Sequence, residues 1–202
     1  DALGREGYYI EPTPGEPNGD GVIGFLDSPA FSIERGCYEE TFNLELSVAD
    51  PLAIIRFTTD GSAPAGPNDG TAYRDPIEIS RTATVRAASF REGYEPSDVM
   101  THTYVFPSQV VSQSNNQPGY PASWAGRPAD YEMDPEVVGD NDLFNGVYRE
   151  SIVDDLKDIP TLSIVINRDD LFGSRGIYLN SQAEGVGWER PASVELFDPE
   201  GE

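Results

Sequence analysis

Residues 42–48 read Phe42-Asn43-Leu44-Glu45-Leu46-Ser47-Val48, so apolar and polar side chains alternate along the whole stretch. A period of two residues is typical of a β-strand that buries one face and exposes the other. We therefore expect the apolar members to face a core. The fold prediction starts from this strand.

Short stretches of the same kind follow it, separated by turn-forming pairs such as Asp50-Pro51 and Asp60-Gly61. No helical periodicity interrupts them before Phe106. Several short strands with frequent turn signals favour an immunoglobulin-like β-sandwich over residues 25–106. The strands expected after the first one are residues 53–59, 77–79, 83–90 and 99–106.

The remaining chain divides into three segments. Residues 1–24 are rich in Gly, Pro and acids, and are expected to be a linker or the tail of a preceding module, with one short strand at 8–10. Residues 107–148 lose all periodicity and are interpreted as an acidic loop or linker.

Residues 149–202 are expected to form a partial α+β segment. The pattern predicts a helix over 148–159, a helical turn at 169–173, and strands at 161–166, 176–179 and 192–197. A turn signal at 198–201 has no strand after it, which predicts an incomplete second domain. The overall fold class is mainly β: an immunoglobulin-like β-sandwich plus a partial α+β segment.

The charge balance is strongly acidic, with 36 acids against 13 bases and a net charge of -23. Such a surface repels phosphate backbones and anionic bilayers, so nucleic-acid binding is excluded and membrane binding is disfavoured. No apolar run approaches the roughly 18 residues of a membrane span. Lys157 is the only lysine, and acid-rich, lysine-poor surfaces suit either salty surroundings or an acidic secreted protein.

Catalytic constellations are absent from the sequence, so no catalytic residue is assigned. His102 is the only histidine and lies in a predicted strand. Cys37 is the only cysteine, which rules out an intrachain disulfide, and its acidic neighbours predict a raised pKa that suits no reactive thiolate. No phosphate-binding loop and no Cys/His metal pattern is present.

Candidate ligand-binding residues come from one turn and from the aromatics of the second half. Asp60 opens a loop that could form a ligand-binding edge, although turn chemistry alone accounts for Asp60-Gly61. Aromatic rings can stack on sugars, and the candidates for this role are Tyr120, Trp124 and Trp188; packing is the commoner role of such rings.

A calcium site is the candidate metal centre. Glu16, Asn18, Asp20 and Asp27 fall at positions 1, 3, 5 and 12 of an EF-hand-like loop. The glutamate at the first position, Pro17 and the absence of flanking helices depart from that pattern. Bound Ca²⁺ would nevertheless relieve carboxylate repulsion in a chain this acidic.

Two stretches resemble known families. Residues 31–106 resemble the chitobiase/β-hexosaminidase C-terminal-type domain, through Ile55-Arg56-Phe57-Thr58-Thr59-Asp60-Gly61-Ser62-Ala63-Pro64 and Val85-Arg86-Ala87-Ala88-Ser89-Phe90. Residues 160–202 resemble the opening of a CotH-type, kinase-like domain, through Pro160-Thr161-Leu162-Ser163-Ile164 and Trp188-Glu189-Arg190-Pro191-Ala192-Ser193-Val194-Glu195-Leu196.

The resemblances imply a non-catalytic accessory portion of a large secreted or cell-surface bacterial protein. Its partners would be other domains of the same polypeptide or neighbouring chains, and glycans. One alternative is the N-terminal part of a CotH-like kinase whose catalytic residues lie beyond residue 202. Another is a calcium-dependent adhesion or matrix module. The implied localisation is extracellular or at the cell surface.

Overall fold

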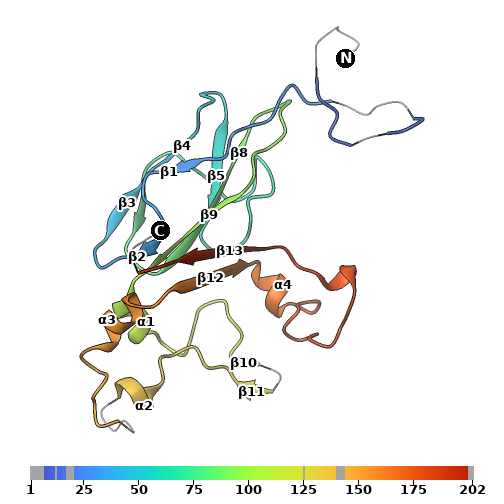
Figure 1. The fold of residues 1–202 in the computed structure, drawn as a ribbon. Coiled ribbons are helices and arrows are strands. Elements are labelled where there is room, and N and C mark those ends of the chain that lie inside the picture. Colours follow the sequence, from blue (N-terminus) through green and yellow to red (C-terminus); the bar gives the residue numbers. More distant parts are fainter. Residues whose placement is uncertain (1–6, 12, 17–20, 125, 140–143, 200–202) are drawn as a thin grey trace.

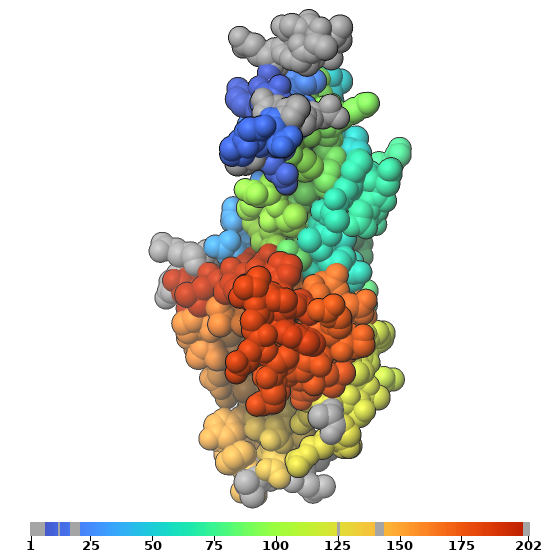
Figure 2. Space-filling model, turned by 90° about the vertical axis from the view of Figure 1, so that its right-hand side faces the viewer, coloured from blue at the N-terminus to red at the C-terminus, as the bar shows by residue number. Residues whose placement is uncertain are grey.

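The computed structural model describes residues 7–11, 13–16, 21–124, 126–139 and 144–199 (Figure 1). The chain is mainly β, as predicted. Figure 2 shows the strands before residue 107 in the upper half of the molecule, and the segment that follows packed below them. Among the described residues, no helix has the length and apolarity needed to cross a membrane.

A five-stranded sheet forms the centre of the upper half, in the order β2-β9-β8-β5-β6. The strands pair antiparallel except β2 with β9, which run parallel. Their bounds are β2 Gly36–Cys37, β5 Ile54–Thr58, β6 Thr71–Ala72, β8 Ala83–Phe90 and β9 Met100–Val105. The predictions of strands at 53–59, 83–90 and 99–106 are confirmed.

Two short pairs make the facing layer: β1 (Ala30–Phe31) with β4 (Leu46–Ser47), and β3 (Phe42–Leu44) with β7 (Ile77–Ile79). The stretch predicted as one strand is therefore two strands with different partners. The change occurs at Glu45, whose N–H donates to Ser32 Oγ and whose carbonyl accepts from the Ser32 N–H. These bonds attach Glu45 to the β1 side while Leu44 still pairs with β7.

The core lies between the two layers. The apolar side chains of residues 42–48 point into it, as predicted. Leu44 and Tyr104 are fully buried, and the Tyr104 hydroxyl donates to Ile33 O at 2.9 Å. That bond satisfies the one polar atom that Tyr104 brings into the core. The buried members of the cluster are Leu44, Leu46, Ile55, Ile79, Val85, Ala87, Tyr104 and Phe106.

The segment after residue 106 contains short helices and two hairpins. The helices are α1 (Pro107–Val111), α2 (Pro135–Val138), α3 (Ile152–Lys157), α4 (Arg168–Phe172) and a 3-10 turn, η1 (Val186–Trp188). Two antiparallel strand pairs, both called hairpins below, join β10 (Ser123–Trp124) with β11 (Arg127–Pro128), and β12 (Thr161–Ile166) with β13 (Ala192–Phe197). In the second pair, α4 and η1 lie between the two strands along the chain.

Several local predictions for this segment are wrong or only partly met. The helix expected over 148–159 is reduced to α3, and α1 and α2 occupy a region read as irregular. Residues 176–179 form turns, because the Ile177 and Tyr178 N–H groups donate to carbonyls of α4 (Asp170 and Leu171) and not to a neighbouring strand. Half of the predicted turn at 198–201 lies outside the described residues.

The strand expected at 8–10 is a single antiparallel bridge between Tyr8 and Val22. No further residue of that stretch joins a sheet. The isolated bridge fits a Gly- and Pro-rich stretch with little apolar surface to bury.

Leu44→Ala is expected to lower the free energy of unfolding by about 2–5 kcal/mol, because it empties a fully buried site in the core. Urea unfolding followed by fluorescence measures this. Leu52→Ala is the matched control, since Leu52 is 68% exposed, and it is expected to change stability by less than about 0.5 kcal/mol. Equal effects of the two variants would contradict the core assignment.

His102 makes stability depend on pH. Its ring is buried against Phe31, with ring centroids 4.2 Å apart, and burial lowers the pKa of His102 below its ordinary value of 6.5. The unfolded chain therefore binds a proton at higher pH than the folded chain. The contribution of neutral His102 is complete above pH 6.5 and is lost as the pH falls toward the folded-state pKa.

Thermal melts between pH 7.5 and about 5.5 test this. We expect the wild-type midpoint to fall across that range, and to fall less steeply in His102→Gln. An identical slope in the variant would assign the pH dependence to carboxylates instead.

Candidate functional site

Polar side chains join the β12–β13 hairpin to the outer face of the central sheet. Arg86 on β8 lies at the centre of this contact. Its guanidinium donates to Gly61 O at 2.9 Å, to Ser193 Oγ at 3.2 Å and to Thr101 Oγ1 at 3.3 Å. One side chain thus connects the end of β5, strand β9 and strand β13, and Arg86 is only 8% exposed.

A second network lies beside it. The Thr103 hydroxyl donates to Glu195 Oε2 at 2.6 Å, and the Thr103 N–H donates to Oε1 at 3.3 Å. Because the Thr103 proton points to Glu195, the Ser163 hydroxyl donates to Thr103 Oγ1, at 2.7 Å. Glu195 is 6% exposed. Among the described residues, no buried side-chain nitrogen or oxygen is left without a partner.

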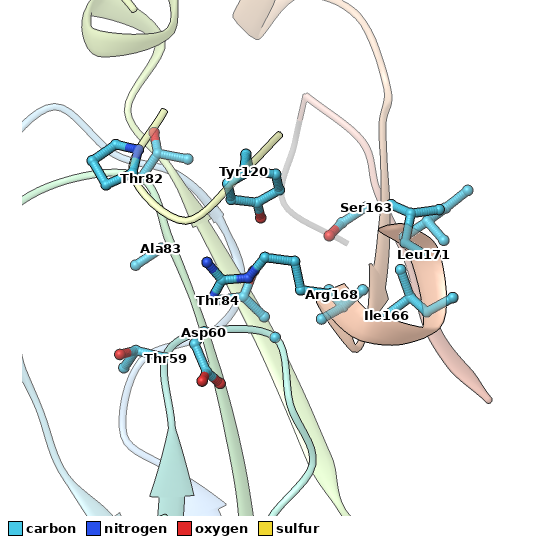
Figure 3. Close-up of a pocket in the computed structure, with 14 residues that line it drawn as sticks. Thr59, Asp60, Thr82, Ala83, Thr84, Tyr120, Ser163, Ile166, Arg168 and Leu171 are labelled. Carbon is cyan, nitrogen blue, oxygen red and sulfur yellow. The ribbon is translucent and has the colours of Figure 1, made fainter. Parts of the chain in front are cut away.

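The sandwich and the β12–β13 hairpin separate at one end of this contact and leave a cleft of about 590 Å³ between them (Figure 3). A second hollow of about 420 Å³ shares Asp60 and Arg168 with it and is also lined by Ser62, Gly119, Asn167 and Asp169. The lining of the main cleft includes Thr59, Asp60, Thr82, Thr84, Pro118, Tyr120, Ser163, Ile166, Arg168 and Leu171.

Asp60 forms the turn that the sequence predicts and also faces the cleft. Its Oδ1 accepts from the Ser62 N–H at 3.0 Å and the Ser62 hydroxyl at 2.6 Å, while Gly61 takes φ +85°. These hydrogen bonds from Ser62, with a smaller contribution from the positive charge of Arg168, lower the pKa of Asp60. The carboxylate is therefore held ionised and in a fixed orientation.

Arg168 is the functional residue that sequence reasoning missed. It begins α4, directly after β12, and its Nη1 donates to Gly119 O at 2.8 Å. The guanidinium lies over the Tyr120 ring, 5.2 Å from the centroid. The sequence did contain a signal for Arg168. It is an arginine that comes just after an apolar strand and before Asp169-Asp170, and polar residues at the ends of strands commonly line binding sites.

Of the aromatic candidates, only Tyr120 reaches the cleft. Trp124 packs instead: its ring meets Tyr131 edge-on at 5.1 Å, and its Nε1–H donates to the Tyr131 hydroxyl at 3.1 Å. Trp188 lies beside a separate hollow of about 640 Å³. The guanidinium groups of Arg175 and Arg190 lie 5.6 and 5.8 Å from the Trp188 ring.

The calcium prediction remains a prediction. Asn18 and Asp20 lie outside the described residues, and of the candidate ligands only Glu16 and Asp27 are described. In the part of the chain that the structure describes, no group of three or more His, Cys, Asp or Glu side chains is arranged to hold a metal ion.

Cys37 lies away from the cleft, beside a hollow that Lys157 also lines. The pKa of the Cys37 thiol is raised, as predicted, but the cause differs. Burial raises it, and the positive charge of Lys157 acts in the opposite direction. The acidic neighbours in sequence are not the main cause.

The outer face of the β12–β13 hairpin is apolar. Leu162 is paired with Leu196, and Ile164 with Val194. Their exposed fractions are 59%, 60%, 62% and 65%, in that order. The hairpin therefore directs its polar side chains to the sandwich, together with Val165 and Phe197, and exposes four aliphatic side chains to the solvent.

Glu195→Ala is expected to loosen the hairpin from the sandwich. It leaves the buried Thr103 N–H without its side-chain acceptor and removes the nearest acceptor of the Thr103 hydroxyl, which costs about 1–3 kcal/mol. Hydrogen exchange followed by mass spectrometry should show faster exchange in β12, β13 and β9. Glu78→Ala, at an exposed position of β7, is the control and should leave exchange unchanged. Unchanged exchange in Glu195→Ala would show that the network does not hold the hairpin.

Comparison with known protein families concerns the sandwich. A family model described as Fn3 associated matches residues 44–104, from the end of β3 to β9. No curated protein matches the chain. The matched stretch excludes residues 160–202, so the CotH-type resemblance is not tested by it. For the sandwich, the match indicates an immunoglobulin- or fibronectin-like associated domain, and it suggests an accessory or structural domain type.

Proposed function

We propose that this chain is a non-catalytic accessory module of a larger secreted or cell-surface assembly. In this proposal the sandwich holds the β12–β13 hairpin in one orientation, and the outer face of the hairpin packs against a neighbouring protein domain. The observation that carries the proposal is that the same two strands bury an inner face, which combines Ser163, Ser193 and Glu195 with Val165 and Phe197, and expose an outer face that is entirely aliphatic.

The outer face is unusual because aliphatic side chains normally point inward from a two-layer structure. Each such side chain contributes about 1.5–3 kcal/mol when it is fully buried. A two-stranded hairpin is also marginal by itself and gains stability from a layer on each apolar face. Here the sandwich covers the polar face, and the apolar one remains available.

We assign the face to a different protein domain rather than to a second copy of this chain. A net charge of -23 on each copy opposes self-association through long-range repulsion. The outward side chains of the hairpin carry no charge, so they fit a partner with an aliphatic or aromatic face. The resemblance of residues 160–202 to the opening of a CotH-type domain supports the same assignment, because a domain of that kind would supply covering elements.

The non-catalytic part of the proposal is supported by the lining of the main cleft. Among the described residues, Asp60 is the one carboxylate that lines it, and Asp169 lies in the hollow beside it. The pKa of Asp60 is lowered, whereas the general acid of a glycosidase has a raised pKa. The serine of the cleft, Ser163, donates to Thr103 and meets no histidine there. The acidic, lysine-poor composition supports the secreted or surface location.

A photo-cross-linking amino acid at position 164 or 194, in the native polypeptide and its native source, tests the docking proposal. We expect cross-links from both positions to one apolar face of one other domain, because both side chains point outward from the hairpin. The control position is 52, an exposed leucine of the sandwich, which should give no such cross-link.

Cross-links from 164 and 194 to a second copy of this chain would overturn the choice of partner. Scattered cross-links, equal to those from position 52, would overturn the docking surface itself. Leu196→Glu adds a charge to the face and should abolish the specific cross-links while the circular dichroism spectrum of the chain is retained.

A further inference from the structure

We propose that the cleft between the sandwich and the β12–β13 hairpin binds a neutral saccharide, held between Asp60 and Arg168. This goes beyond the docking function, because the cleft lies between the sandwich and the hairpin, and Ile164 is the one member of the outer-face set that also lines it. The proposal rests on the geometry of two opposite charges, the hydroxyl groups around them and the size of the cleft.

Asp60 supplies the acceptor. Both hydrogen bonds from Ser62 go to Oδ1, so Oδ2 receives none from another residue of the described chain. An ionised carboxylate oxygen in a fixed orientation accepts strongly from a hydroxyl group. Asp60 and Arg168 both line the cleft (Figure 3).

Arg168 supplies the donors. Its one hydrogen bond within the described chain runs from Nη1 to Gly119 O, so further N–H groups of the guanidinium remain for a ligand. Stacking on Tyr120 holds the group in place. The close approach requires glycine at 119, because a Cβ atom there would overlap Nη1, and the φ of Gly119 is +81°.

The surrounding surface combines hydroxyl groups and apolar patches. Threonine and serine hydroxyls come from Thr59, Thr82, Thr84 and Ser163, and apolar surface comes from Ile166 and Leu171. A sugar ring presents the same combination, with hydroxyl groups around its edge and C–H groups on its faces. The volume of about 590 Å³ falls within the roughly 300–1,000 Å³ of small-molecule sites.

The charge of the protein selects a neutral ligand. Arg168 faces Asp60 across the cleft, so the two charges of the main cleft balance locally. The net charge of -23 repels anions such as uronates or nucleotides at longer range. A neutral saccharide is unaffected by that field and can hydrogen-bond to both groups.

Calorimetric titration of the full chain with separate neutral tetrasaccharides tests the proposal. The probes are cellotetraose, chitotetraose, xylotetraose and mannotetraose, each at up to about 10 mM, a concentration that detects millimolar affinity. We expect at least one to bind. Binding should also raise the midpoint of thermal unfolding. The cleft has walls from both the sandwich and the β12–β13 hairpin, so the site exists only while the hairpin is packed on the sandwich.

Two variants locate the binding. Asp60→Asn retains the turn but replaces one carboxylate oxygen, an acceptor, by an amide NH₂ group, a donor. Arg168→Gln removes the positive charge and the N–H donors of the guanidinium. Each should weaken binding about tenfold or more, since a hydrogen bond to a charged group contributes about 1.5–3 kcal/mol. Arg175→Gln is the matched control, because that guanidinium lies beside Trp188 in a different part of the surface.

Gly119→Ala gives an independent check, because it displaces the Arg168 guanidinium without altering any side chain that donates to the ligand. It should weaken binding as Arg168→Gln does. Circular dichroism confirms that each variant is folded.

Absence of binding by all the probes would overturn the proposal, as would equal loss in Arg175→Gln. Binding confined to a uronate-containing oligosaccharide, added as a further titration, would overturn the neutral class. None of these outcomes affects the cross-links from position 194, which does not line the cleft, so failure of this site and failure of the docking proposal are distinguishable.

Discussion

The buried contact between Thr103 and Glu195 is the interaction on which the arrangement of this molecule depends. A carboxylate that is 6% exposed must have hydrogen-bond donors, and the sheet provides them through one threonine N–H and hydroxyl. The polar face of the hairpin therefore has to turn toward the sandwich. Because side chains alternate along a strand, the aliphatic face has to turn outward.

The same contact explains why β9 is buried on both faces. On β9, His102 and Tyr104 point into the sandwich core, while Thr101 and Thr103 lie under the hairpin. The central sheet is therefore the middle of three layers. Arg86 extends this arrangement to the cleft, since it holds the end of β5 at Gly61 and β13 at Ser193 with one guanidinium.

Local patterns predicted the strands well, because a period of two is a property of a few consecutive residues. Residues 83–90, 161–166 and 192–197 are strands with those bounds. The exchange of partners at Glu45 and the turns at 176–179 were missed, since both depend on hydrogen bonds to distant residues. The sequence predicted only some of the residues that line the cleft. Asp60 and Tyr120 were candidates, but Arg168 comes close to them only when the hairpin packs on the sandwich, which local sequence patterns do not reveal.

Periodicity identifies a strand but does not decide which of its faces is covered. In the core strands the apolar set is buried, whereas in β12 and β13 the side chains that face protein are Ser163, Ser193 and Glu195 with Val165 and Phe197, and the other aliphatic side chains are exposed. A fully hydrogen-bonded polar contact fixes orientation more than it adds stability, because desolvation offsets much of the gain. The exposed aliphatic face of the β12–β13 hairpin is thus left for a neighbouring domain to cover. This division of roles suits a module that sets the direction of a neighbouring domain while a second contact supplies the binding energy.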